Sequence, residues 1–313
     1  MDELRGHQAT WRFDGSEIRI RYHTGWFKDE LLQELGSCTV PVEAVAAVDF
    51  RVGTGRRKPW AMALRLREGA DPYTAVGAQL SESSQPFRLT GSHKQELVAE
   101  YYADQIAFAA GVADGAEAAP PADPAVATNL VPALPVHIQT SEGTGSFDGA
   151  TVRFVWAGSE ASGRKKREQR REFALSDIRD VEWVPSDGWE WGHLRILSGA
   201  GGTAREGPPT KPKHDVTCLL CDEGAEGAAT LLLAATIRAY HWALASPAAP
   251  HTRGSGAVAA AREAPELESS QDSADSASAV IYERIRQLAQ LHAEGILTDE
   301  EFAAKKAQLL DRL

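Results

Sequence analysis

The sequence predicts an α+β protein with two small β-barrels or sandwiches, each closed by a C-terminal helix, followed by a short helical hairpin. Three observations predict it: an internal repeat, alternating apolar and polar runs that end in a helical pattern in each copy, and a purely helical period near the C-terminus. At 313 residues, 43% hydrophobic and 25% charged, the chain is long enough for two packed domains.

The repeat opens on a tight turn. Phe13-Asp14-Gly15 recurs as Phe147-Asp148-Gly149, and Asp and Gly both tolerate the backbone angles of such turns. Apolar and polar residues then alternate in both copies, as in a half-buried strand. The apolar positions are Ile18, Ile20 and Tyr22 in the first copy, and Val152, Phe154 and Trp156 in the second.

Later segments match in the same order. Residues 42–50 correspond to 175–183 with apolar residues at the same places, and Leu64-Arg65-Leu66 corresponds to Leu194-Arg195-Ile196. A further strand is expected in each copy, at 87–89 and 216–220. The sequence pattern therefore predicts several short strands before the helix in each copy.

A helix closes each copy and is expected to cover apolar surface of the strands. In the first copy, Ser92 and Gln95 fit a capping box and Gly111 can end the helix. The long apolar run from Ala228 to Ser246 contains Arg238, which favours a buried helix over a membrane span. The apolar residues at helical spacing are Leu97, Val98, Tyr101 and Phe108 in the first copy, and Leu231, Leu232, Ala235, Ala239 and Trp242 in the second.

The composition divides the chain into five segments. Two stretches rich in Ala with Pro, Ser or Gly have no sustained period and are expected to be flexible or extended linkers. The predicted boundaries are 7–111 for the first repeat, 112–136 for a Pro/Ala linker, 137–246 for the second repeat, 247–279 for a low-complexity linker and 280–313 for the hairpin.

The hairpin is predicted to self-associate. Gly295 separates two amphipathic helices, and Thr298 with Glu301 fits a capping box for the second. So short a hairpin buries too little apolar surface to be stable alone, so a second copy is the expected partner. The predicted oligomerisation residues are Ile281, Ile285, Leu288, Leu291, Ile296, Leu297, Phe302, Leu309 and Leu310.

Two family resemblances support this division. Residues 286–306, with a leucine-bearing helix, a Gly-Ile-Leu-Thr bend and Glu-Glu-Phe, closely resemble the SHOCT family, which implies a role in oligomerisation. The repeated body, with its Phe-Asp-Gly openings and the run Trp191-Gly192-His193-Leu194-Arg195, resembles a tandem family of domains of unknown function from high-GC Gram-positive bacteria. That resemblance implies pleckstrin-homology-like barrels and no established activity.

Charge and cysteine content restrict the partners and the compartment. The net charge of −11 repels phosphate backbones, so nucleic acid is not an expected partner. Three cysteines are too few for a disulfide framework and suit a reducing compartment, and the first residues lack the pattern of a secretion signal. The expected location is the cytoplasm.

No catalytic motif appears, so the protein is expected not to be an enzyme and to need no cofactor or metal. Cys218 and Cys221 have redox or zinc spacing, with His214 upstream, but no second cysteine pair exists. Residues three apart on a strand point to opposite faces, which favours buried structural cysteines. A redox or hydrolytic enzyme using these thiols remains the alternative.

One basic cluster stands out against the acidic background. It follows the first strand of the second copy and could bind an anionic lipid or acidic peptide, although a solvated loop is the competing interpretation. Its residues are Arg164, Lys165, Lys166, Arg167, Arg170 and Arg171.

These patterns give two hypotheses of function. The first is a non-catalytic scaffold that self-associates through the hairpin and binds a protein or peptide with its barrels. The alternative is peripheral binding of anionic lipid, or another anionic ligand, through the basic cluster.

Overall fold

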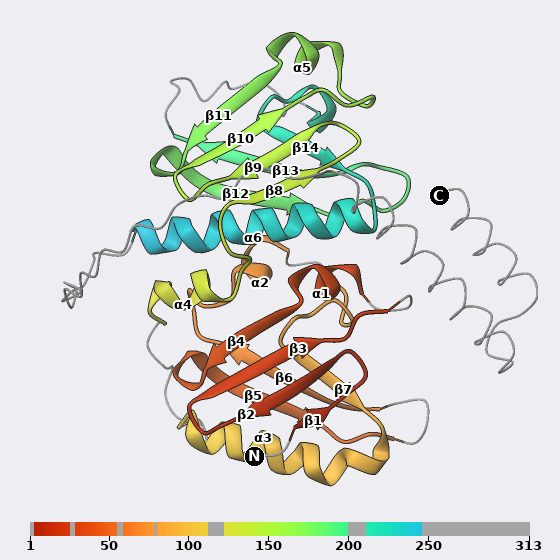
Figure 1. Cartoon of the computed structure of the whole chain (residues 1–313), viewed down its shortest axis with the longest axis vertical. Coiled ribbons are helices and arrows are strands. Elements are labelled where there is room, and N and C mark those ends of the chain that lie inside the picture. Colours follow the sequence, from red (N-terminus) through yellow and green to blue (C-terminus); the bar gives the residue numbers. More distant parts are fainter. Residues whose placement is uncertain are drawn as a thin grey trace, which may run out of the picture. The chain divides into compact units, whose positions relative to one another are not determined.

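In the computed structural model, the described residues are 3–25, 29–54, 59–77, 80–111, 122–199 and 211–245 (Figure 1). All of them lie in one compact unit, Met1–Ala249. The second linker and the nine predicted oligomerisation residues, from Ile281 to Leu310, lie outside the described residues.

The first repeat contains two antiparallel sheets and a closing helix. One sheet has four strands in chain order, and the other has three. The four are β1 (Leu4–Arg5), β2 (Ala9–Phe13), β3 (Glu17–Tyr22) and β4 (Ser37–Pro41); the three are β5 (Val45–Arg51), β6 (Trp60–Leu66) and β7 (Arg88–Gly91). The closing helix α3 (Glu96–Ala109) packs against β5, β6 and β1.

The second repeat has the same order. Its four-stranded sheet, its three-stranded sheet and its closing helix follow one another along the chain. The strands are β8 (Val136–Gln139), β9 (Thr144–Phe147), β10 (Thr151–Val155) and β11 (Arg170–Ala174), then β12 (Ile178–Val184), β13 (Gly192–Ser198) and β14 (Cys218–Cys221); the helix is α6 (Ala225–Ala245).

The α+β class and the tandem arrangement are thus as the sequence predicted, but closed barrels are not seen. In the part of each repeat that the structure describes, the strands form two separate sheets and no ladder joins one sheet to the other. The chain passes between the sheets through a short 3₁₀ turn, Val42–Ala44 in the first repeat and Leu175–Asp177 in the second.

The predicted turns and their strands are confirmed. The carboxylate of Asp14 accepts hydrogen bonds from the backbone N–H of Ser16 and Glu17, and Asp148 accepts from Ala150 and Thr151. The glycine that follows each aspartate has φ near +100°, where a side chain would be strained. In β3 and β10 the alternating apolar residues are buried as predicted.

The predicted correspondence of Leu64–Leu66 with Leu194–Ile196 is wrong by two residues. Leu64 pairs with Val48 of β5, and Ile196 pairs with Val181 of β12, so Leu64 corresponds to Ile196. A periodicity of two allows this slip, because moving a strand by two residues keeps its apolar face.

Two expectations for α3 are also wrong. The Ser92 side chain makes no capping hydrogen bond, and the helix begins at Glu96 after a 3₁₀ turn. Its buried side carries Ala99, Tyr102, Ala103 and Ile106, whereas the four apolar residues predicted to face the strands are exposed: Leu97, Val98, Tyr101 and Phe108.

Helix α6 lies between the two repeats (Figure 1). It contacts β12, β13 and β8 of its own repeat, and it also contacts three short helices of the first repeat and the linker. These are α1 (Glu30–Leu35), α2 (Pro72–Val76) and α4 (Pro124–Asn129). Because it is covered on both sides, α6 is buried almost all round along its first four turns. Among the described helices, α6 included, none has both the length and the apolarity needed to cross a membrane.

The short helices were not expected from the sequence. Each starts at a side chain that accepts a hydrogen bond from backbone N–H of its first turn: Asp29 for α1, Asp71 for α2 and Asp123 for α4. Helix α4 lies in the stretch predicted to be a flexible or extended linker, and Ala127 and Leu130 there are buried.

Candidate anion-binding surface and the ion pair beneath it

The basic cluster lies on a short helix, α5 (Gly163–Glu168), and on the start of β11. The Ser162 hydroxyl accepts a hydrogen bond from Lys165 N–H and begins the helix, and Gln169 ends it with φ of +64°. The sequence analysis predicts a loop here, because a six-residue helix without an apolar stripe gives no periodic signal.

Four of the six predicted anion-binding residues are exposed: Arg164, Lys166, Arg167 and Arg170. None of the four forms an ion pair with any other described residue. The side chains of Lys166 and Arg167 reach only the backbone carbonyls of Ser159 and Gly163. Arg171 is half-buried, with its guanidinium 5.5 Å from the centre of the Phe173 ring.

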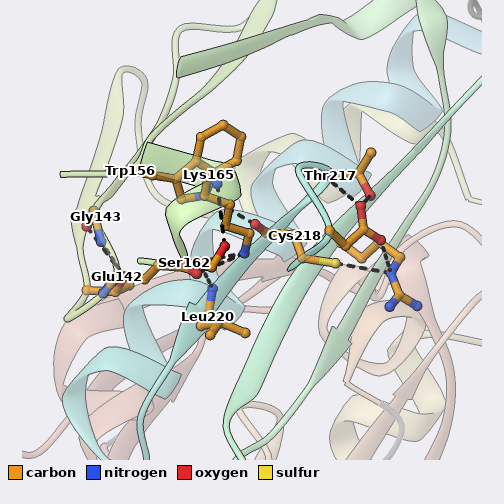
Figure 2. Close-up of polar contacts among 11 residues, drawn as sticks. Glu142, Gly143, Trp156, Ser162, Lys165, Thr217, Cys218 and Leu220 are labelled. Atoms are coloured by element: carbon orange, nitrogen blue, oxygen red, sulfur yellow. Dashed lines mark hydrogen bonds and ion pairs between the residues drawn. The ribbon is translucent and has the colours of Figure 1, made fainter. Parts of the chain in front are cut away.

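Lys165 does not belong to this surface, which corrects the sequence prediction. Its side chain and that of Glu142 are both 0% exposed. Lys165 Nζ lies 2.9 and 2.8 Å from the two carboxylate oxygens of Glu142 (Figure 2). Its ammonium is therefore neutralised from within and is not available to an external anion.

Glu142 holds three parts of the second repeat together. It lies in the turn between β8 and β9, and besides Lys165 it accepts a 2.8 Å hydrogen bond from Leu220 N–H on β14. The Trp156 ring covers the other side of Lys165, with its centre 5.8 Å from Nζ (Figure 2). A buried pair with such bonds links α5, the β8–β9 turn and β14.

Burial shifts both members of this pair toward their neutral forms. Loss of hydration raises the pKa of Glu142 and lowers the pKa of Lys165, and their mutual attraction opposes both shifts. The short two-point contact and the Leu220 N–H favour the ionised pair.

The first repeat has an uncharged version of the same arrangement. Gln8 occupies the equivalent turn between β1 and β2, and its amide oxygen accepts a hydrogen bond from Thr90 N–H on β7. At the end of α1, Gly36 N–H donates to the Leu32 carbonyl, and at the end of α5, Gln169 N–H donates to the Lys165 carbonyl. Leu32 is therefore the counterpart of Lys165, and it is also buried. The second repeat thus replaces a Gln and Leu with a Glu and Lys.

A second polar group lies beside the pair, on β13 and β14. The Arg195 guanidinium donates to Cys218 Sγ at 3.1 Å and to Glu182 at 3.0 Å, and it lies 3.5 Å from Asp215. His193, one strand position before Leu194, is buried, and neither ring nitrogen has a hydrogen-bond partner among the described residues. Burial, followed by the nearby Arg195 charge, lowers the pKa of His193 and favours neutral imidazole.

Cys218 and Cys221 are both buried, with free thiols. Burial raises the pKa of both Cys218 and Cys221 to about 12, which disfavours the reactive thiolate at neutral pH. Cys218 meets Arg195, whereas Cys221 interacts with Thr230 of α6, so the two sulfurs face opposite sides of β14 as predicted. The described residues hold no cluster of ligands suited to a metal ion.

Comparison with known families follows the division into repeats and a terminal segment. The family model described as domain of unknown function DUF4429 matches the chain twice, at residues 11–107 and 145–238. The chain belongs to the DUF4429 family. Residues 283–310 of this DUF4429 protein match the short C-terminal domain, SHOCT. The predicted tandem repeat and the SHOCT segment are therefore confirmed. No curated protein matches the chain significantly.

One exposed apolar surface of this DUF4429 protein was not predicted from the sequence. On the outer side of α3, Leu97, Tyr101 and Phe108 are 80%, 53% and 75% exposed, with Val98 beside them at 52%. Their spacing gave the opposite expectation, because an apolar stripe usually faces the core. The small buried residues Ala99 and Ala103 were the available signal, since they let the helix approach the sheet closely.

Proposed function

We propose that this DUF4429 protein is a non-catalytic interaction protein that self-associates through its SHOCT segment and binds a protein partner with its repeats. The order of sheets and closing helix in each repeat supports a pleckstrin-homology-like fold, a scaffold without a required active site. Three free, buried thiols support a reducing compartment, for which we propose the cytoplasm.

The observation that carries the binding half of the proposal is the outer face of α3. Exposed apolar side chains at positions 97, 101 and 108 lie on one side of a single helix, with Val98 adjacent. Contiguous exposed apolar patches are characteristic of protein-binding surfaces.

The self-association half rests on the SHOCT match and on the apolar pattern of residues 280–313. Light scattering of the full chain beside a chain truncated before Val280 tests it. We expect the full chain to have a mass of two or more copies and the truncated chain a smaller one. Equal masses would contradict self-association through this segment.

The exposed cations of α5 favour a second candidate, binding of an anionic ligand. Arg164, Lys166, Arg167 and Arg170 are exposed on α5 or at the start of β11, and they form no ion pair within the described part of the chain. Arg and Lys side chains in such a group bind phosphate and carboxylate through charge-assisted hydrogen bonds.

Sedimentation with phosphatidylserine vesicles tests this candidate. The full chain would pellet with the vesicles, and Arg164→Glu with Arg167→Glu would lose the pelleting while leaving the Lys165 pair intact. Arg21→Glu with Arg179→Glu carries the same charge change at exposed sites elsewhere. Pelleting that both double variants lose would reflect net charge alone, and pelleting that neither loses would contradict the candidate.

A further inference from the structure

The two closing helices differ in what covers their outer faces. The outer face of α6 is covered by α1, α2 and α4, whereas the outer face of α3 leaves Leu97, Tyr101 and Phe108 exposed. In Figure 1, α3 lies at one end of the compact unit, α6 at its middle and α5 at the other end. The same helix position is thus covered once and exposed once.

The equivalence holds residue by residue. Gly91 is the last residue of β7, and Cys221 is the last residue of β14. Tyr101 lies as many residues after Gly91 as Leu231 lies after Cys221. Leu231 is buried and approaches Gly77, at the end of α2. Tyr101 is therefore exposed at the position where α6 buries a leucine against the first repeat.

One of the three helices that cover α6 has a counterpart among the described residues of the second repeat. Helix α5 of the second repeat is equivalent to α1, so Arg164 corresponds to Leu31 and Arg167 to Glu34. Leu31 is buried in the described unit, where α1 contacts α6, while Arg164 and Arg167 are exposed. The covering surface at α5 is free, just as the covered surface at α3 is.

The residues that changed between the repeats are complementary in charge. On α3, the exposed Glu100 and Asp104 lie beside Tyr101, and they correspond to the buried Thr230 and Ala234 of α6, of which Thr230 interacts with Cys221 of its own sheet. On α5, arginines occupy the positions of Leu31 and Glu34 of α1. Acidic residues thus flank the exposed apolar residues of α3, and basic residues lie on α5, the counterpart of one helix that covers α6.

We propose that α5 of one copy docks on the outer face of α3 of a second copy, which repeats between molecules the contact that α1 makes with α6 within one. Arg164 and Arg167 would pair with Glu100 and Asp104, and their stems and guanidinium planes would cover Tyr101 and Phe108. Such a contact joins different surfaces of the two copies, so it does not close on itself and extends into a stack. The inference rests on the proposed function, since it names the partner of the α3 face.

Sedimentation velocity of the full chain over a concentration series tests the contact. We expect assemblies that grow beyond the smallest oligomer as the concentration rises. Reversal of α5 (Arg164→Glu with Arg167→Glu) or of α3 (Glu100→Arg with Asp104→Arg) should raise the concentration needed for growth at least about tenfold. Combining the four substitutions restores opposite charges and should return growth to within about threefold of the native chain.

The controls separate this contact from the proposed function. Arg21→Glu with Arg179→Glu should leave growth unchanged, and circular dichroism checks that each variant is folded. The contact is overturned if the fourfold variant does not recover, if only the α3 reversal has an effect, or if the α5 reversal loses vesicle pelleting with unchanged growth. In each of these cases the truncation before Val280 still decides self-association independently.

Discussion

At the level of single residues, the main difference between the repeats is one buried ion pair. Glu142 and Lys165 stand where the first repeat has Gln8 and Leu32, and Glu142 and Gln8 both bind the backbone N–H of their repeat's last strand. Removing one member of a buried pair leaves an uncompensated charge, whereas replacing both with a neutral pair can be nearly neutral in free energy.

A double-mutant cycle checks this comparison. Lys165→Leu or Glu142→Gln alone should lower the free energy of unfolding by about 3–5 kcal/mol, because each leaves one buried charge without its partner. The double variant recreates the first repeat's Gln and Leu and should lie within about 1 kcal/mol of the native chain. Urea unfolding measures all four proteins. A double variant as unstable as the sum of the single variants would contradict the equivalence of the two sites.

The turn aspartate Asp14 should make the stability of the fold depend on pH. Hydrogen bonds from Ser16 and Glu17 N–H lower the pKa of Asp14 from 3.8 to about 2. A carboxylate with a lowered pKa in the folded state stabilises the fold above its unfolded pKa, and this contribution is lost as pH falls through the folded value.

The stability difference between the native chain and Asp14→Asn should therefore be constant above pH 3.8 and shrink as the pH approaches 2. Thermal unfolding of both proteins across this range measures it. A difference that does not change with pH would show that the charge of Asp14 makes no contribution.

At the level of elements, the ends of α1 and α5 offer a matched pair. Gly36 ends α1 with φ of +66°, and Gln169 ends α5 with φ of +64°. Glycine adopts positive φ without the steric cost that a side chain brings. No atom lies closer than 4.0 Å to a Cβ built on Gly36, so backbone conformation dominates the cost there.

Gln169→Gly should raise the free energy of unfolding by about 1 kcal/mol, and Gly36→Gln should lower it by a similar amount. Urea unfolding of the two variants beside the native chain gives both values. Changes of the same sign in the two variants would contradict a purely conformational cause.

The elements also show how far the sequence alone could go. The turns at Asp14 and Asp148 and the strands after them were predictable, because turn chemistry and alternation are local. The buried face of α3 was not, since its apolar residues 97, 101 and 108 lie on the exposed side and alanines face the sheet. Hydrophobic periodicity identifies a helical stripe but does not say what covers it.

At the level of the whole molecule, the missed features depend on contacts distant in sequence. Lys165 is buried because it pairs with Glu142. In the sequence Glu142 is only an acidic residue in a turn, and its role becomes visible when the two repeats are compared in the correct register. Likewise, the second side of α6 is covered by α1, α2 and α4, and the sequence gives no sign of those contacts. The basic cluster can be found in the sequence, but its division into one buried, one half-buried and four exposed residues requires the fold.

The repeats and the SHOCT segment support the proposal that this protein works by assembly. The DUF4429 matches at 11–107 and 145–238 identify the body, and the exposed faces of α3 and α5 are the two surfaces that we propose for protein contacts. Several linked copies would present these surfaces together, and linkage raises the overall affinity without any new contact.

Self-association is tested most directly by the molar mass of the intact chain in solution. Light scattering measures this mass over a range of concentrations. We expect a mass well above the 33.8 kDa of one chain, rising further as the concentration increases. A mass of 33.8 kDa at every concentration would contradict it.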